Sequence, residues 1–95
     1  GPPRTWTPTE TGFVASVAGL AAMAAAWASG DSLTVRRMAH QLRGAGSGYG
    51  FPAVTDAAAN VEAALVACAG HPPEAELESI RARVEALAAV CRRAA

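Results

Sequence analysis

The stretch HQLRGAGSGYGFP, residues 40–52, holds the side chains of this sequence that are best suited to chemistry. A histidine, His40, stands three positions before Arg43, and four glycines follow at positions 44, 46, 48 and 50. A neutral imidazole is a good nucleophile near neutral pH, and a guanidinium group hydrogen-bonds phosphoryl oxygens. Glycine-rich runs can also cradle the phosphates of a bound nucleotide. The stretch therefore has two functional interpretations: it binds a nucleotide, or its histidine carries a phosphoryl group.

The residues around the glycines argue against nucleotide binding. Residues 48–53, GYGFPA, satisfy the loose pattern G-x-G-x-x-A. That pattern binds a pyrophosphate only when it follows a β-strand and opens the helix of a βαβ unit. Here a helical pattern of apolar residues precedes it, and no stretch of the chain alternates as strands do. We therefore expect no nucleotide cofactor in this chain.

An apolar stripe on the helix around His40 predicts where the imidazole points. On an ideal helix, at about 100° per residue, the centre of this stripe lies about 160° from His40, so the imidazole faces water. Arg36, Arg43, Gly44 and Ser47 fall within about 60° of His40 on the same outer face. The stripe consists of Val35, Met38, Ala39, Leu42, Ala45 and Tyr49.

This outer face combines a nucleophile, two cations and a position without a side chain. Gly44 costs the helix about 1 kcal/mol relative to alanine. A bulkier residue there would stand where a partner must approach His40, which gives the glycine a reason. A plain solvated helix face, with no role in chemistry, explains a histidine beside arginines equally well. Spacing alone leaves both interpretations open.

Four amphipathic helices account for the chain, each with start and stop signals at its ends. Their expected bounds are Thr7 to Gly30, Asp31 to Gly50, Pro52 to Gly70, and a stretch that follows the connector 71–73. The first helix begins with the capping box Thr7–Glu10, and Asp31 is the expected N-cap of the second. The stripe of the first helix is Phe13, Val17, Leu20, Ala24 and Trp27; that of the third is Val54, Ala57, Ala58, Val61, Leu65 and Cys68; that of the fourth is Leu77, Ile80, Val84, Leu87 and Cys91.

Short connectors make helices that are neighbours in sequence run antiparallel. We therefore predict an all-α fold, an antiparallel up-down-up-down four-helix bundle, over residues 7–95. Residues 1–6 are interpreted as a tag remnant followed by an N-terminal extension. A chain of 95 residues suits one such domain and a single core.

The charge balance and the two cysteines exclude several classes of partner and of binding site. Eight basic residues, all arginine, balance eight acidic ones, so no basic field recruits nucleic acid or an anionic membrane. Neither a signal peptide nor a membrane span fits the alanine-rich run 13–28, and a cytoplasmic monomer is expected. Cys68 and Cys91 are expected to be buried reduced thiols at opposite ends of the bundle, with no disulfide and no metal site.

The motif around the histidine resembles the histidine-containing phosphotransfer (HPt) domain family. The residues that carry the resemblance are His40, Gln41, Leu42, Arg43, Gly44, Gly50, Phe51, Pro52 and Glu62. The resemblance implies an antiparallel four-helix bundle whose exposed histidine accepts a phosphoryl group from the aspartate of a response-regulator receiver domain and passes it to another receiver. It implies a carrier and not an enzyme, with Mg²⁺ on the receiver and no cofactor in this chain.

Carried over by position, the resemblance makes His40 the phosphoacceptor, Arg43 the cation that steadies the phosphoryl group, and Gly44 the small residue that admits the receiver. Arg43 stands where lysine is commoner in the family, which preserves the charge. Glu62 either orients the imidazole through a ring N–H or is purely structural, because its carboxylate would also repel a phosphoryl group. Arg36, Ser47 and Glu62 are thus possible supporting residues.

Other interpretations are kept beside this one. The chain could be the phosphoacceptor domain at the start of a chemotaxis-type histidine kinase, a piece of a hybrid sensor kinase, or a four-helix interaction or dimerisation module that is never phosphorylated. The expected partner surface is the outer face of the first two helices around His40. On the first helix, four alanines off the stripe would give it a flat contact ring: Ala15, Ala18, Ala22 and Ala25.

Overall fold

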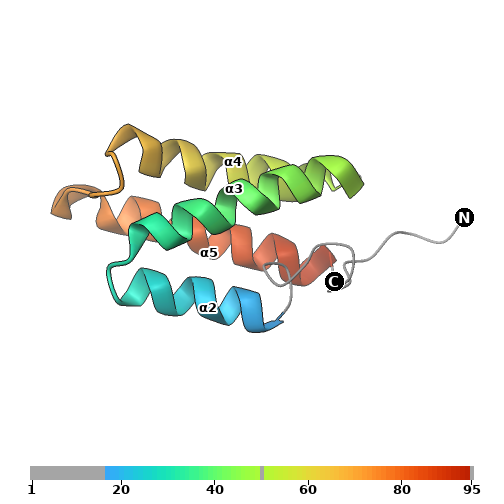
Figure 1. Cartoon of the computed structure of the whole chain (residues 1–95), viewed down its shortest axis with the longest axis horizontal. Coiled ribbons are helices and arrows are strands. Elements are labelled where there is room, and N and C mark those ends of the chain that lie inside the picture. Colours follow the sequence, from blue (N-terminus) through green and yellow to red (C-terminus); the bar gives the residue numbers. More distant parts are fainter. Residues whose placement is uncertain (1–16, 50, 95) are drawn as a thin grey trace, which may run out of the picture.

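The computed structural model describes residues 17–49 and 51–94, and every regular element in them is helical. The elements are α2 (Val17–Ala28), α3 (Ser32–Tyr49), α4 (Pro52–Ala67), the 3₁₀ helix η2 (Glu74–Glu76) and α5 (Leu77–Ala94). In Figure 1 each of the four α-helices runs in the opposite direction to the one before it. The predicted all-α class is confirmed. The capping box Thr7–Glu10, Phe13 and Gly50 lie outside the described residues.

The helix boundaries follow the signals in the sequence. Asp31 caps α3: its Oδ1 accepts a hydrogen bond from the Thr34 backbone N–H at 3.2 Å, and its Oδ2 from the Thr34 hydroxyl at 2.6 Å. These bonds to Thr34 hold the pKa of the Asp31 carboxyl below its usual value. Gly30 (φ +80°) and Gly70 (φ +78°) adopt the left-handed conformation that ends a helix. Pro52 is the first residue of α4, as expected.

The core forms between the four helices, and each of them contributes side chains that are at most 1% exposed. These include Met23 from α2, Leu42 from α3, Leu65 from α4 and Cys91 from α5. The stripes predicted for the second and third helices are confirmed wherever side chains are described. The buried members are Val35, Met38, Ala39 and Leu42 in α3, and Val54, Ala58, Val61 and Leu65 in α4, with Ala57 and Cys68 partly buried.

Two members of the predicted stripes are wrong. Ala24 is exposed, and Met23 is buried in its place, because α2 faces the core through Leu20, Met23 and Trp27. Alanines surround these positions, so the hydrophobic pattern offered little contrast between neighbouring faces. Leu77 is 41% exposed, since it is the first residue of α5 and the packed part of that helix starts at Ile80.

Within the described residues, no helix combines the length and the apolar character that a membrane span requires.

Both cysteines are free thiols. Cys91 is buried, and Cys68 is half-buried with its Sγ donating to the carbonyls of Ala64 and Leu65, each at 3.4 Å. Burial raises the pKa of the Cys91 thiol to about 11. The two sulfurs therefore differ in accessibility.

Leu42 tests the packing between the helices. Its side chain is fully buried in the core, so Leu42→Ala should lower the free energy of unfolding by about 2–5 kcal/mol. Leu33, on the same helix, is 50% exposed, and Leu33→Ala should cost about 1 kcal/mol or less. Urea unfolding followed by circular dichroism measures both. Equal losses for the two variants would contradict the packing described.

The reactivity of the Cys91 thiol tests whether this side chain is buried in the core. Since the thiolate is the reactive form, burial and the raised pKa together should protect Cys91 from iodoacetamide at about pH 8. Cys68, which is only half-buried, should be alkylated first, and Cys91 only when the chain unfolds in denaturant. Mass spectrometry of peptides from the alkylated protein measures this order. Alkylation of Cys91 at the rate of Cys68 under native conditions would contradict it.

Candidate functional site

His40 stands outward from α3. Its side chain is 62% exposed, whereas Ala39 and Leu42 on the opposite face are fully buried. The orientation follows from the stripe, because the core fixes the rotation of the helix about its own axis. The prediction that the imidazole faces water is confirmed.

Glu62 of α4 anchors the ring. Its Oε2 lies 2.6 Å from Nδ1 of His40, and its side chain is only 14% exposed. The carboxylate is placed there by the packing of α4 against α3, since its chain neighbour Val61 and Leu65, one turn on, are both fully buried in the core between the helices. A short, half-buried contact of this kind holds the ring in one orientation.

The contact also selects the tautomer of His40. Because a carboxylate only accepts hydrogen bonds, the neutral ring satisfies this contact as the Nδ1–H tautomer, in which Nδ1–H donates a hydrogen bond to Oε2 of Glu62. Nε2 of the neutral ring is then left with its lone pair on the exposed side. Arg43 Nη2 lies 3.5 Å from Nδ1, a contact and not a second hydrogen bond, because a protonated Nδ1 has no lone pair to accept with.

Arg43 is tied to the same carboxylate. Its Nη1 lies 2.9 Å from Oε1 of Glu62, and its side chain is 45% exposed. Glu62 therefore binds the imidazole with one oxygen and the guanidinium with the other. The three side chains form a single charge-assisted network on the surface of α3 and α4, with the cation next to the nucleophile.

Gly44 leaves open space one turn after His40. A Cβ built at this position would meet no atom of the described chain within 4 Å. The packing inside the domain therefore does not require a glycine here. Arg36 is exposed one turn before His40, on the predicted face. Ser47 lies in α3, but its side chain is outside the described residues.

A groove of about 450 Å³ lies beside the histidine. It is lined by Leu33, Arg36, Arg37, His40 and Glu62. Sequence reasoning missed Leu33 and Arg37, although a signal was present. Both lie on the outer face of the helix within about 60° of His40, as the helical repeat places them.

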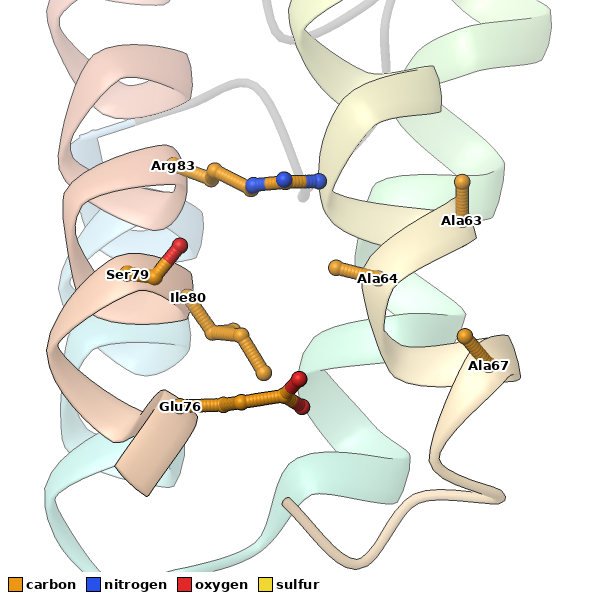
Figure 2. A pocket seen from close by; sticks show the side chains of 7 residues that line it. All are labelled: Ala63, Ala64, Ala67, Glu76, Ser79, Ile80 and Arg83. Atoms are coloured by element: carbon orange, nitrogen blue, oxygen red, sulfur yellow. The ribbon is translucent and has the colours of Figure 1, made fainter. Parts of the chain in front are cut away.

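A second groove, of about 280 Å³, runs between α4 and α5 (Figure 2). One wall carries the alanines of α4, and the other carries Ser79, Ile80 and Arg83 of α5, with Glu76 at one end. The Arg83 guanidinium donates to the Asn60 carbonyl at 3.3 Å. This groove contains no histidine or cysteine, and nothing in it pairs a nucleophile with a base as His40 and Glu62 are paired.

The predicted alanine ring on the first helix needs correction. Ala22 is half-buried and packs against the core, so it is not the fully exposed member of the ring that was predicted. Ala25 is exposed, as predicted. Ala15 and the side chain of Ala18 lie outside the described residues. The error has the same origin as that at Ala24, namely the low contrast between faces of an alanine-rich helix.

Comparison with known proteins gives one family. The family model described as Hpt domain matches residues 13–90, which is most of the chain and includes every site residue named above. Searches of the curated proteins and of the solved structures find no significant match. Members of the matched family are phosphoryl carriers that work with receiver domains, and this agrees with the resemblance seen in the motif.

Glu62→Ala tests the control of the histidine tautomer. In the wild-type protein, the neutral His40 ring should be mainly the Nδ1–H form, because Glu62 accepts that proton. Without the carboxylate, the population should shift toward the Nε2–H form. Nitrogen-15 NMR of the imidazole nitrogens measures the ratio.

His71 serves as an internal reference for this measurement. It is exposed in the connector before η2, and no hydrogen bond to its ring is found among the described residues. Its tautomer ratio should be the same in both proteins. An unchanged His40 ratio in Glu62→Ala would show that the 2.6 Å contact does not select the tautomer.

Proposed function

Since the chain belongs to the Hpt domain family, we propose that His40 is the phosphoacceptor of a phosphorelay. It takes a phosphoryl group from the aspartate of one receiver domain and passes it to the aspartate of another. The observation that supports this most strongly is the orientation of the ring, with Nδ1 held by Glu62 and Nε2 open to a partner. The four helices described above present this ring, and we assign residues 7–95 to the domain that they form, as the sequence predicts.

The transfer step follows from the tautomer. The Nε2 lone pair of His40 attacks phosphorus, the P–O bond of the aspartyl phosphate breaks, and the aspartate leaves as a carboxylate with the electron pair of that bond. The ring keeps its proton on Nδ1 and becomes a phosphorylated imidazolium. Transfer to the second receiver reverses these bond changes. No proton has to leave the ring in either direction.

Glu62 favours the transfer reaction in this scheme. The imidazolium that forms carries a charge which the neutral ring did not have, and the carboxylate 2.6 Å from Nδ1 stabilises it. The repulsion between Glu62 and the phosphoryl group is reduced for two reasons. The two groups bind opposite nitrogens of the ring, and Arg43 neutralises the carboxylate from the side at 2.9 Å.

Arg43 and Gly44 act on the partner's side of the reaction. The Nη2 of Arg43 is not bound by Glu62 and lies 3.5 Å from Nδ1 of the ring, so a phosphoryl group on Nε2 has a cation nearby, and Arg36 supplies a second exposed cation on the same face. The open space at Gly44 admits the receiver. Ser47 is kept as a supporting residue on the sequence alone.

The metal of the reaction is assigned to the partner. No group of three or more histidine, cysteine or acidic side chains with the arrangement of a metal site occurs within residues 17–49 and 51–94. We assign the Mg²⁺ that neutralises the transferring phosphoryl group to the receiver, as the family resemblance implies. The chain then contributes the nucleophile, its orientation and one or two cations.

Labelling with a phosphorylated receiver tests the proposal. Receiver domains from the organism that encodes the chain are charged with radioactive phosphate and mixed with it. The expected product carries acid-labile, alkali-stable label on His40. His40→Gln should abolish the label, and Arg43→Ala should slow its appearance about 10- to 100-fold, because a cation at the transferring group is lost.

His71→Gln is the matched control, since it removes the other histidine of the chain and should leave the rate of labelling unchanged. Label that persists in His40→Gln would contradict the proposal. So would the absence of label from every receiver tested with the wild-type protein.

A further inference from the structure

Leu33 lines the groove beside His40, and Val66 follows Glu62, another residue of the lining, by one helical turn. Leu33 is 50% exposed and Val66 is 54% exposed, and only Leu77 joins them as an exposed large hydrophobic residue in the described part of the chain. Single exposed hydrophobic residues need no explanation, but a pair beside a reactive residue suggests a contact surface.

The contacts between α3 and the chain that follows His40 place this pair on one face. His40 meets Glu62, and Leu33 meets the position of Gly70, so residues 33–40 face residues 62–70 in antiparallel order. Val66 lies midway along the second of these stretches, one turn after Glu62 on the same side of α4. Leu33 and Val66 therefore lie at the end of the groove away from Gly44.

Leu33 is held in place by the connector after α4. A Cβ built on Gly70 would lie 2.9 Å from Cδ2 of Leu33, so the glycine, at φ +78°, leaves the room that the leucine occupies. Half of the side chain rests on this support and half is open to solvent. An apolar group that is already ordered loses little entropy when a partner covers it, which favours it as an anchor.

The charge of the groove selects the chemistry of the partner. Arg36 and Arg37 line it and are exposed, and neither forms an ion pair with any described residue. Glu62 is the one acid in the lining, and both of its oxygens are already bound. Asp31 lies near enough to Arg37 to interact with its charge, but the two arginines still leave the groove with net positive charge beside the apolar side chain of Leu33. An acidic surface with an apolar side chain is its complement.

We propose that the receiver domain docks on this side of the site, seating an apolar side chain against Leu33 and an acidic one against Arg37. This inference rests on the proposed function and adds the two residues that select among receivers. Leu33 supplies the apolar contact and Arg37 the electrostatic one. Neither touches the phosphoryl group.

The test separates docking from chemistry by using two phosphodonors. Phosphoramidate, a small donor whose P–N bond breaks as ammonia leaves, phosphorylates an imidazole without docking. The receiver that labels the wild-type chain fastest is the second donor. Leu33→Ala and Arg37→Glu are compared with Leu77→Ala and Arg93→Glu, which make the same changes at exposed positions outside the groove.

We expect the rate of phosphoryl transfer to fall when the receiver is the donor, and to stay unchanged with phosphoramidate. Phosphoramidate should label all four variants at the wild-type rate. The receiver should transfer about tenfold more slowly, in kcat/KM, to Leu33→Ala and to Arg37→Glu than to the wild type or the two controls. The loss in Arg37→Glu should shrink when the salt is raised from about 0.05 M to about 0.5 M, because salt screens exposed charges. The loss in Leu33→Ala should persist.

Three outcomes overturn the inference. Equal transfer from the receiver to all variants would refute the docking surface and leave the proposed function standing. A wild-type dimer in analytical ultracentrifugation that Leu33→Ala dissociates would show that a second copy of the chain occupies the groove. Failure of both donors to label wild-type His40 would remove the proposed function, and the inference with it.

Discussion

The packing of α3 against α4 joins two side chains that lie 22 residues apart in sequence, the imidazole of His40 and the carboxylate of Glu62. The 2.6 Å contact between them depends on the core, because Leu42 and Val61 set the rotation of each helix and hence the direction of each functional side chain. It decides which ring nitrogen is protonated, and so which is nucleophilic. It also draws in Arg43 through the other carboxylate oxygen, which places a cation beside the ring on its Nδ1 side.

The division between buried and exposed faces of the domain gives the site its chemical character. The side of α3 that holds His40 is open, and Gly44 leaves space there that the chain itself does not fill. A carrier needs such an open nucleophile, since its substrate is held on the surface of another protein. The groove of Leu33 and Arg37 continues the same face and adds apolar area and positive charge. The imidazole, the guanidinium and the proposed contact surface thus all lie on the outer face of two packed helices.

Much of this structure could be predicted from the sequence, and the exceptions have physical reasons. The stripe around Leu42 stands out because arginines and other polar residues occupy the rest of that helix, and the outward direction of His40 followed from it. The stripe around Val61 could be followed because Asp56, Asn60 and Glu62 interrupt the alanines of α4. In α2, by contrast, alanine occupies most positions, so the pattern did not distinguish Met23, which is buried, from its neighbour Ala24. The role of Glu62 stayed open for a different reason. Whether its carboxylate reaches the ring depends on how α4 sits against α3, which neither helical pattern contains.

The position of the phosphoryl group on the imidazole tests the central claim most directly. Long-range proton–nitrogen NMR of the phosphorylated chain, recorded beside the phosphorus-31 spectrum, distinguishes the two ring nitrogens. With Nδ1 donating to Glu62, the phosphorus should be bonded to Nε2, and Nδ1 should keep its proton. A phosphoryl group on Nδ1 would require the bond to Glu62 to break before the reaction, and would contradict this account of the site.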